Sequence, residues 1–218
     1  MPSSIFSHQA PALLIKLKYP NKFDGTALCL STIIPDLLIL TNFFIPEDLR
    51  SISHSLLGQF IWTLPMTLIS TIIFSRYLGP LISRIASVDN FLFKPLAFFG
   101  LDNWNTLKRK KFNKRFFIIA SYSAIIGGLT HLLLDLPSHG TIELFSPWLI
   151  LKSPSFLLIP LSNPNLIQID SRVIDATLTV YRLIWFLETI IFFFISLYLL
   201  RLIKTKSNRI EIKNSIIN

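Results

Sequence analysis

Four long apolar stretches, separated by polar and basic segments, set the hydrophobic pattern of the chain. They cover roughly residues 27–45, 55–75, 116–136 and 178–200. Each is close to the about 20 apolar residues that an α-helix needs to cross a bilayer. The pattern predicts an all-α integral membrane bundle with about four transmembrane helices, and shorter amphipathic or interfacial helices between them.

The two long connections between these stretches differ in character. Residues 76–115 are amphipathic and basic, and we expect them to form a cytoplasmic loop. Residues 137–175 are rich in Pro, Ser and Asn, with an apolar patch at 156–161 that we expect at the membrane interface. No internal repeat of 20–50 residues is evident. The sequence therefore predicts a single membrane domain over residues 1–218.

The composition is typical of a membrane protein, and it excludes an intrachain disulfide and some types of zinc site. The chain has 218 residues, of which 51% are hydrophobic and only 15% charged, whereas soluble domains carry about 25% charged residues. The single cysteine, Cys29, excludes an intrachain disulfide. It also excludes zinc sites of the Cys₄ or Cys₂His₂ type.

The net charge of +9 comes from basic residues that gather in three places. Lys16, Lys18 and Lys22 precede the first stretch, nine Lys or Arg lie in 76–115, and five lie in 201–218. Because Lys and Arg concentrate in cytoplasmic segments, we expect these three segments, and both termini, on the cytoplasmic side of the cell membrane. The basic residues flank membrane spans, so we expect membrane lipid rather than nucleic acid as their partner.

Two polar residues interrupt the third apolar stretch. His131 and Asp135 are four positions apart, so a helix places them on one face. Charged residues inside a membrane cost about 2.5–3.5 kcal/mol on insertion scales and are mostly functional. Imidazole and carboxylate are ligands of divalent metals, zinc above all. We expect Pro137 to end this helix, which leaves His139 on the following turn as a third candidate ligand.

Other candidates lie elsewhere along the chain. His54 opens the second stretch on the same predicted side of the membrane and is a fourth candidate ligand. Asp36, directly after Pro35, is a candidate ligand, catalytic group or orienter of a histidine. His8 joins the ligand set if the short stretch up to Lys18 dips into the membrane. Glu143 follows the cluster and is a candidate general base.

These motifs resemble a known family. The run 127–140, which holds His131, Asp135 and His139, continues to Ser146-Pro147-Trp148 and resembles the signature of the membrane-bound metal-dependent hydrolases. Pro35-Asp36 and the run 53–58 match two further blocks in the same order. Over about residues 1–148, the resemblance implies a metal-dependent hydrolase buried in the membrane.

The resemblance is closer still to an uncharacterised branch of that group, a domain of unknown function. Its members open with Met-Pro and a Phe-Ser-His box, here Met1-Pro2 and Phe6-Ser7-His8, and carry a Leu-Pro in the second span, here Leu64-Pro65. Better-known hydrolases of the group have an additional Asp-His and an additional His. Leu38-Ile39 and Arg50-Ser51-Ile52 occupy those places in this chain, which therefore offers fewer ligands.

Three functional interpretations remain open at this point. The leading one is a hydrolase in which a divalent metal, with zinc favoured, activates water against a lipid-like ester or phosphoester. The second is a non-catalytic membrane protein that uses the same His/Asp residues as a structural metal or hydrogen-bond site. The third is a proton- or ion-coupled transporter, which uses the same residue types inside the membrane.

Overall fold

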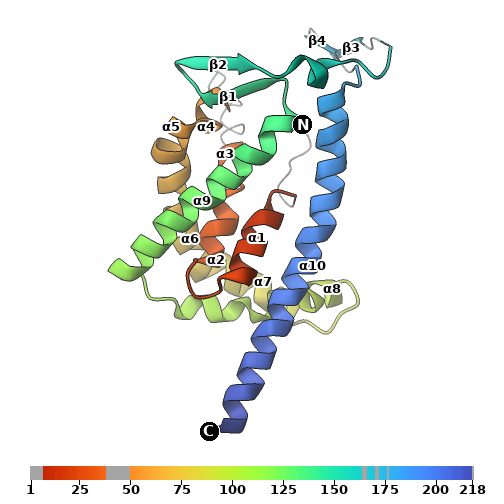
Figure 1. Cartoon of the computed structure of the whole chain (residues 1–218). Coiled ribbons are helices and arrows are strands. Elements are labelled where there is room, and N and C mark those ends of the chain that lie inside the picture. Colours follow the sequence, from red (N-terminus) through yellow and green to blue (C-terminus); the bar gives the residue numbers. More distant parts are fainter. Residues whose placement is uncertain (1–6, 38–49, 164–165, 170–171, 176, 218) are drawn as a thin grey trace.

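The computed structural model describes residues 7–37, 50–163, 166–169, 172–175 and 177–217 as a mostly helical molecule (Figure 1). Three helices within these residues are long and apolar enough to cross a membrane: Leu56–Ala86, Lys114–Ser138 and Val180–Ser207. This architecture fits the predicted all-α fold and indicates membrane association. The predicted count of about four spans is not confirmed.

The first predicted span is interrupted where the structure describes it. Residues 27–37 belong to α2 (Gly25–Ser31) and the short α3 (Ile34–Leu37), and residues 38–45 lie outside the described part of the chain. Pro35 accounts for a break here, because proline has no N–H to donate and restricts the residue before it. Before α2, helix α1 (Gln9–Lys18) lies beside it (Figure 1).

The second long helix is continuous but changes its pitch twice. It consists of α5 (Leu56–Gly58), the π-helical η2 (Gln59–Thr63), α6 (Leu64–Ile73), the π-helical η3 (Phe74–Leu78) and α7 (Gly79–Ala86). Pro65 and Pro80 each follow a π-helical segment, and such local widening is one way in which a helix accommodates a disturbed hydrogen-bond ladder.

The predicted loop 76–115 is therefore largely helical. The second long helix continues to Ala86, and α8 (Lys94–Phe98) and the 3₁₀-helix η4 (Leu101–Arg109) follow it. The apolar pattern of 55–75 ends before the helix does, because α7 is amphipathic and packs against η4. Hydropathy alone therefore placed the end of this helix too early.

Helix α9 (Lys114–Ser138) is the central helix of the bundle. The Asn113 side chain begins it by accepting a hydrogen bond from Phe116 N at 3.0 Å. It ends one residue after Pro137, close to the predicted end. Small buried residues let α2 and the second long helix approach it closely: Ala120, Ser123, Ala124, Gly127 and Gly128.

Two antiparallel hairpins lie where α9 ends and α10 (Val180–Ile217) begins (Figure 1). The first pairs β1 (Thr141–Phe145) with β2 (Leu149–Lys152), and the second pairs β3 (Leu166–Ile169) with β4 (Arg172–Asp175). The 3₁₀-helix η5 (Ser155–Leu158) lies between the hairpins. None of these strands was predicted from the sequence.

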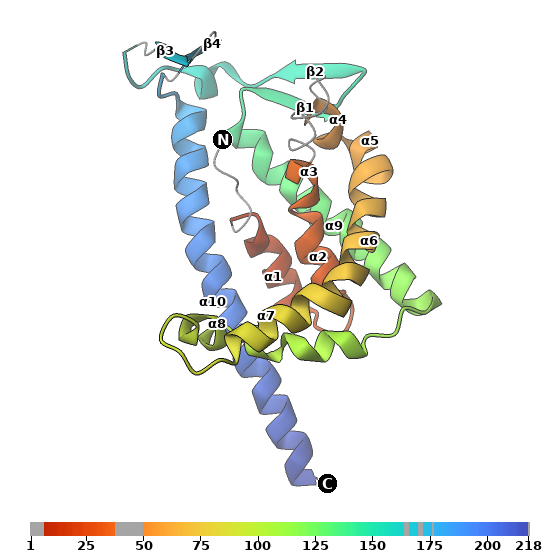
Figure 2. The ribbon, with the colours of Figure 1, turned by 180° about the vertical axis from the view of Figure 1, so that it is seen from behind.

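The opposite end of the molecule, seen from behind in Figure 2, carries α7, α8 and η4. We call it the basic end, because the cluster of Lys and Arg at 108–115 lies there. Lys110 Nζ lies 2.8 Å from Asp24 Oδ2, which ties this end to the start of α2. Lys204 Nζ lies 3.2 Å from Asp102 Oδ2 and ties it to α10.

Candidate metal centre

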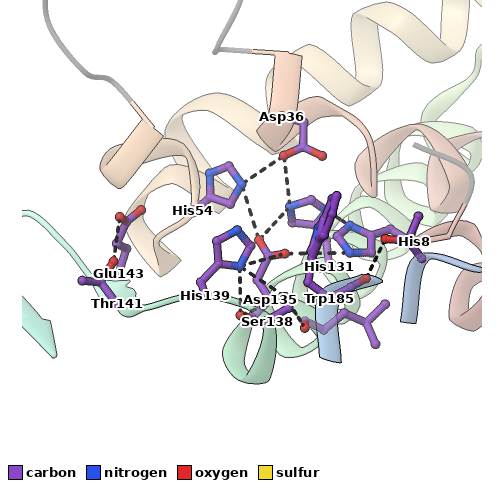
Figure 3. A network of polar contacts seen from close by, with 12 residues as sticks. His8, Asp36, His54, His131, Asp135, Ser138, His139, Thr141, Glu143 and Trp185 are labelled. Carbon is purple, nitrogen blue, oxygen red and sulfur yellow. Dashed lines mark hydrogen bonds and ion pairs between the residues drawn. The ribbon is translucent and has the colours of Figure 1, made fainter. Parts of the chain in front are cut away.

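Residues far apart in sequence form a polar cluster near the end of α9 that faces the hairpins (Figure 3). Helix α9 supplies His131 and Asp135 one turn apart, as the spacing predicted, and their Nε2 and Oδ2 atoms are 3.3 Å apart. Asp36 comes from α3, and His54 lies between α4 (Arg50–Ser53) and α5. His8 directly precedes the first residue of α1.

Four of these side chains close a ring of alternating nitrogen and oxygen atoms. His54 Nε2 lies 3.2 Å from Asp36 Oδ1 and 3.5 Å from Asp135 Oδ2. His131 Nε2 lies 3.9 Å from Asp36 Oδ1 and 3.3 Å from Asp135 Oδ2. We call Asp36, His54, His131 and Asp135 the His/Asp ring. Two ligands of one tetrahedral zinc, each bonded at about 2.1 Å, lie about 3.4 Å apart, so each neighbouring pair in the ring has a separation that suits two ligands of one ion.

The hydrogen bond of the other His131 nitrogen strengthens this argument. His131 Nδ1 lies 2.9 Å from the Thr32 carbonyl oxygen, which can only accept, so Nδ1 carries the proton. In the neutral imidazole, Nε2 then presents a lone pair to two carboxylates. Among the described residues, neither His131 Nε2 nor Asp135 Oδ2 makes a hydrogen bond, although both are buried. The lone pair of Nε2 and the negative carboxylate oxygen repel each other. A cation bound between them removes this repulsion, and so does a second proton on His131.

His8 extends the cluster from α1. Its Nδ1 lies 2.8 Å from His131 Nδ1, and its Nε2 lies 3.8 Å from Asp135 Oδ1. His8, His131 and Asp135 thus form a second group of ligand atoms within 4.8 Å of one another, beside the group of Asp36, His54 and His131. The structure thus brings the start of α1 to the cluster, which is the condition on which His8 joins the candidate ligands.

His8 and Asp36 lie outside the long helices, and the cluster shifts the pKa of each of them for a different reason. Burial lowers the pKa of His8 to about 4, and nearby His131 acts in the same direction. Burial by itself favours a higher pKa for Asp36, but the hydrogen bond from His54 and the charges of His131 and His54 outweigh it and lower the pKa. At neutral pH, His8 is therefore a neutral imidazole and Asp36 a carboxylate, and these are the forms that bind metal.

His139 and Glu143 lie beside the ring rather than within it. His139 Nδ1 donates to the Asp135 carbonyl oxygen at 3.0 Å, and neither ligand group of the described residues includes it. Glu143 Oε1 accepts a hydrogen bond from Thr141 Oγ1 at 3.4 Å. Both side chains line a small pocket that His54 and Asp135 also border. The pocket thus connects the ring with the predicted general base.

The supporting contacts of the ring were not evident from the sequence. Ser53 Oγ lies 2.9 Å from His54 Nδ1, and the Thr32 carbonyl fixes His131. Gln9 Nε2 donates to Thr32 Oγ1 at 2.7 Å, and Trp62 Nε1 donates to Ile34 O at 3.1 Å beside Asp36. Such outer contacts orient metal-binding histidines in known sites. Ser53 beside His54 was visible in the sequence, but a backbone carbonyl carries no residue signal.

Fold and cluster together define a class: a helical, membrane-associated protein with a buried His/Asp cluster at one end of its bundle. Within this class, the chain belongs to the family described as a domain of unknown function (DUF4184), whose model matches residues 1–216. No curated protein and no solved structure matches the chain. The family match agrees with the predicted resemblance to an uncharacterised family.

Proposed function

We propose that the chain is a membrane-embedded, metal-dependent hydrolase whose His/Asp ring holds a divalent metal, with zinc favoured. The observation that carries this proposal is the closed ring of two imidazole nitrogens and two carboxylate oxygens, 3.2–3.9 Å apart. Nitrogen and oxygen donors of this kind suit zinc. His8 and His139 are the further candidate ligands beside the ring.

The pocket supports a catalytic rather than a purely structural use of the ring. Bound zinc lowers the pKa of a coordinated water to about 7 and so supplies a nucleophile at neutral pH. Glu143, in the wall of the same pocket, is the group that we propose takes up the proton. Asp36, which faces His54 Nε2, acts as a ligand or keeps that imidazole in place.

The surroundings of the pocket favour a lipid-like substrate. Thr141, Glu143 and Leu144 of β1 form one wall, and the hairpin that contains β1 exposes large apolar side chains. Trp148 is 77% exposed and Ile150 is 51% exposed, and nearby Phe156 is 58% exposed. Apolar side chains that stand free of the protein are typical of contact with membrane lipid. An ester or phosphoester of a membrane lipid is the substrate class that we propose.

Charge supports an orientation in the cell membrane. The basic end lies opposite the cluster (Figures 1 and 2), and cytoplasmic segments are enriched in Lys and Arg. We therefore propose that the basic end and the C-terminal tail face the cytoplasm and that the cluster lies toward the other side. His8 lies at the cluster and residues 1–6 lie outside the described part of the chain, so this orientation does not extend to the predicted cytoplasmic N-terminus.

Two variants test the hydrolase proposal against a panel of lipid esters and phosphoesters. In zinc-loaded protein, His131→Ala removes both bound zinc and turnover. Glu143→Gln keeps the zinc and lowers turnover by about 10²–10⁴-fold, the usual contribution of a general base. Asp89→Asn, at an exposed carboxylate, leaves both unchanged. Metal-loaded wild type without turnover on the whole panel contradicts the proposal.

One observation favours a second candidate, a structural metal site. The ring already offers four protein ligand atoms, and structural zinc sites are closed in this way, whereas catalytic sites keep one position open. In that case, removing zinc or replacing His131 by Ala lowers the melting temperature. No hydrolysis accompanies the metal, and Glu143→Gln has no effect on the melting temperature.

A further inference from the structure

A row of polar side chains runs along the buried face of the second long helix. It consists of Gln59, Thr63, Thr67, Thr71 and Ser75, one every four residues, and none is more than 2% exposed. We call this set the polar row. It covers about 20–24 Å of helix. It starts one turn after Ser55, the neighbour of His54, and ends next to Arg76 at the basic end.

The two π-helical segments keep the polar row on one face. Four residues exceed one α-helical turn of 3.6 residues, so a four-residue period drifts around an ideal α-helix. In a π-helix the hydrogen bonds connect i and i+5, so four residues fall short of a turn and the drift is reversed. η2 and η3 lie at the two ends of the row. The helix geometry therefore maintains a continuous polar edge through an apolar bundle.

The polar row differs from several other hydroxyl groups in the described helices. Thr189 Oγ1 donates to the Trp185 carbonyl at 2.8 Å, and Ser123 and Thr130 also bond to carbonyls of the preceding turn. This is the usual solution in a helix. Within the described residues, by contrast, the hydroxyls of Thr63, Thr67, Thr71 and Ser75 and both polar atoms of Gln59 are buried without a hydrogen-bond partner.

The end of the polar row that holds Gln59 and Thr63 faces helix α9. A methyl group added to Gly128 would lie 1.8 Å from Gln59 Oε1 and 3.2 Å from Thr63 Cγ2. Gly128 is three residues, almost one turn, before His131 of the His/Asp ring. The Gln59 end of the polar row thus lies next to the His/Asp ring, and the Ser75 end lies at the basic end of the molecule.

We propose that the polar row binds a file of water molecules and forms a hydrated track between the His/Asp ring and the basic end. Buried polar groups without protein partners are the groups that ordered internal waters bridge. A row of hydroxyls at each helical turn lets each water contact two successive side chains. The track gives the buried cluster a route for water and protons, and it does not depend on whether the ring catalyses hydrolysis.

Transfer of magnetisation from water to threonine methyl groups tests the track in the full chain, reconstituted in lipid bilayers and measured by solid-state NMR. We expect the methyl signals of Thr63, Thr67 and Thr71 to rise within about twofold of the rate of exposed Thr106, because ordered waters contact them. Thr189, whose hydroxyl bonds to the backbone, is the matched control and rises several-fold more slowly. Rates as slow as that of Thr189 overturn the proposal.

A melting experiment gives a second readout with opposite signs for the two cases. In a hydrated track, Thr67→Val removes a water ligand and lowers the melting temperature. In a dry seam, the same change removes an unsatisfied buried hydroxyl and raises it or leaves it unchanged, which contradicts the proposal. Thr189→Val, the same substitution on α10, controls for the loss of an ordinary helix hydroxyl. Thr67→Val also assigns the Thr67 methyl signal.

Discussion

Helices α9 and α10 are both long and apolar enough to cross a membrane, yet they differ in how much of their surface is buried in the bundle. In an apolar stretch of 18 residues from each helix, 39% is buried in α9 but only 11% in α10. The inward side of α9 is made mostly of Gly, Ala and Ser and carries His131, which is fully buried. α10 instead exposes Phe186, Ile191 and Phe194, which are 53–63% accessible.

The difference shows what hydropathy does not distinguish. Small residues allow close approach between membrane helices, and polar residues among them mark sites. Large apolar residues on α10 suit contact with lipid. The helix that exposes large apolar side chains is therefore peripheral here, whereas the helix with a buried side of mostly small residues is the scaffold of the candidate metal centre.

The largest expected effect comes from the ring carboxylate of α9. Asp135→Asn keeps the shape of the side chain but removes the charge that faces His54 and His131. Because a direct ligand contributes more than the 10–100-fold of an outer contact, we expect zinc affinity to fall about 1,000-fold or more, measured by competition with a chelating dye. Asp102→Asn, which disturbs the contact to Lys204 of α10, should leave the zinc affinity unchanged. Equal affinities in the two variants would refute the assignment.

The next effect concerns the close packing of α9. A methyl group on Gly127 would lie 2.1 Å from Ser31 Oγ and 2.4 Å from the Leu28 carbonyl oxygen. Overpacking against backbone is not relieved by a side-chain rotation, so Gly127→Ala should lower the free energy of unfolding by about 2–3 kcal/mol. Gly140→Ala, whose methyl group meets atoms only at 3.8 Å, is the control in the same denaturation experiment. A neutral Gly127→Ala would show that α2 and α9 are not in this contact.

A smaller effect should follow from the contact between α1 and the ring. His8 lies 2.8 Å from His131 Nδ1. His8→Ala should therefore lower zinc affinity by about 10–100-fold, as the loss of an orienting contact does. Lys18→Ala, at the other end of α1, tests whether displacement of the helix alone explains the change. If both variants bind zinc like the wild type, α1 has no part in the site.

The smallest effect should occur on α10. Leu187 is 47% exposed, so Leu187→Ala should change the free energy of unfolding by no more than about 0.5 kcal/mol. The same substitution at Leu132 of α9, which is 4% exposed, should cost about 2–5 kcal/mol. Unfolding of both variants in one detergent system measures the difference. Similar losses at the two positions would remove the distinction between the helices.

Much of this arrangement was accessible from the sequence. The spacing of His131 and Asp135 predicted their common face, and Asp36 and His54 were candidates to join them, as was His139, which lies beside the ring. These predictions worked because helical periodicity and proline are local properties. The metal-binding and catalytic roles of these residues remain predictions.

Other features depend on the folded chain and left no readable pattern. All four residues of β2 are exposed, so its strand shows no alternation of buried and exposed positions. The four-residue period of the polar row becomes one face only when η2 and η3 change the pitch. The carbonyl that accepts a hydrogen bond from His131 Nδ1 belongs to Thr32, and any residue provides such a backbone group.

X-ray absorption at the zinc edge of the zinc-loaded wild-type protein tests the central claim most directly. The His/Asp ring predicts one tightly bound zinc per chain, with nitrogen and oxygen ligands at about 2.0–2.1 Å. The spectrum should also carry the scattering signature of at least two imidazoles, from His54 and His131. Folded protein that binds no zinc, or zinc bound without imidazole, would contradict the account.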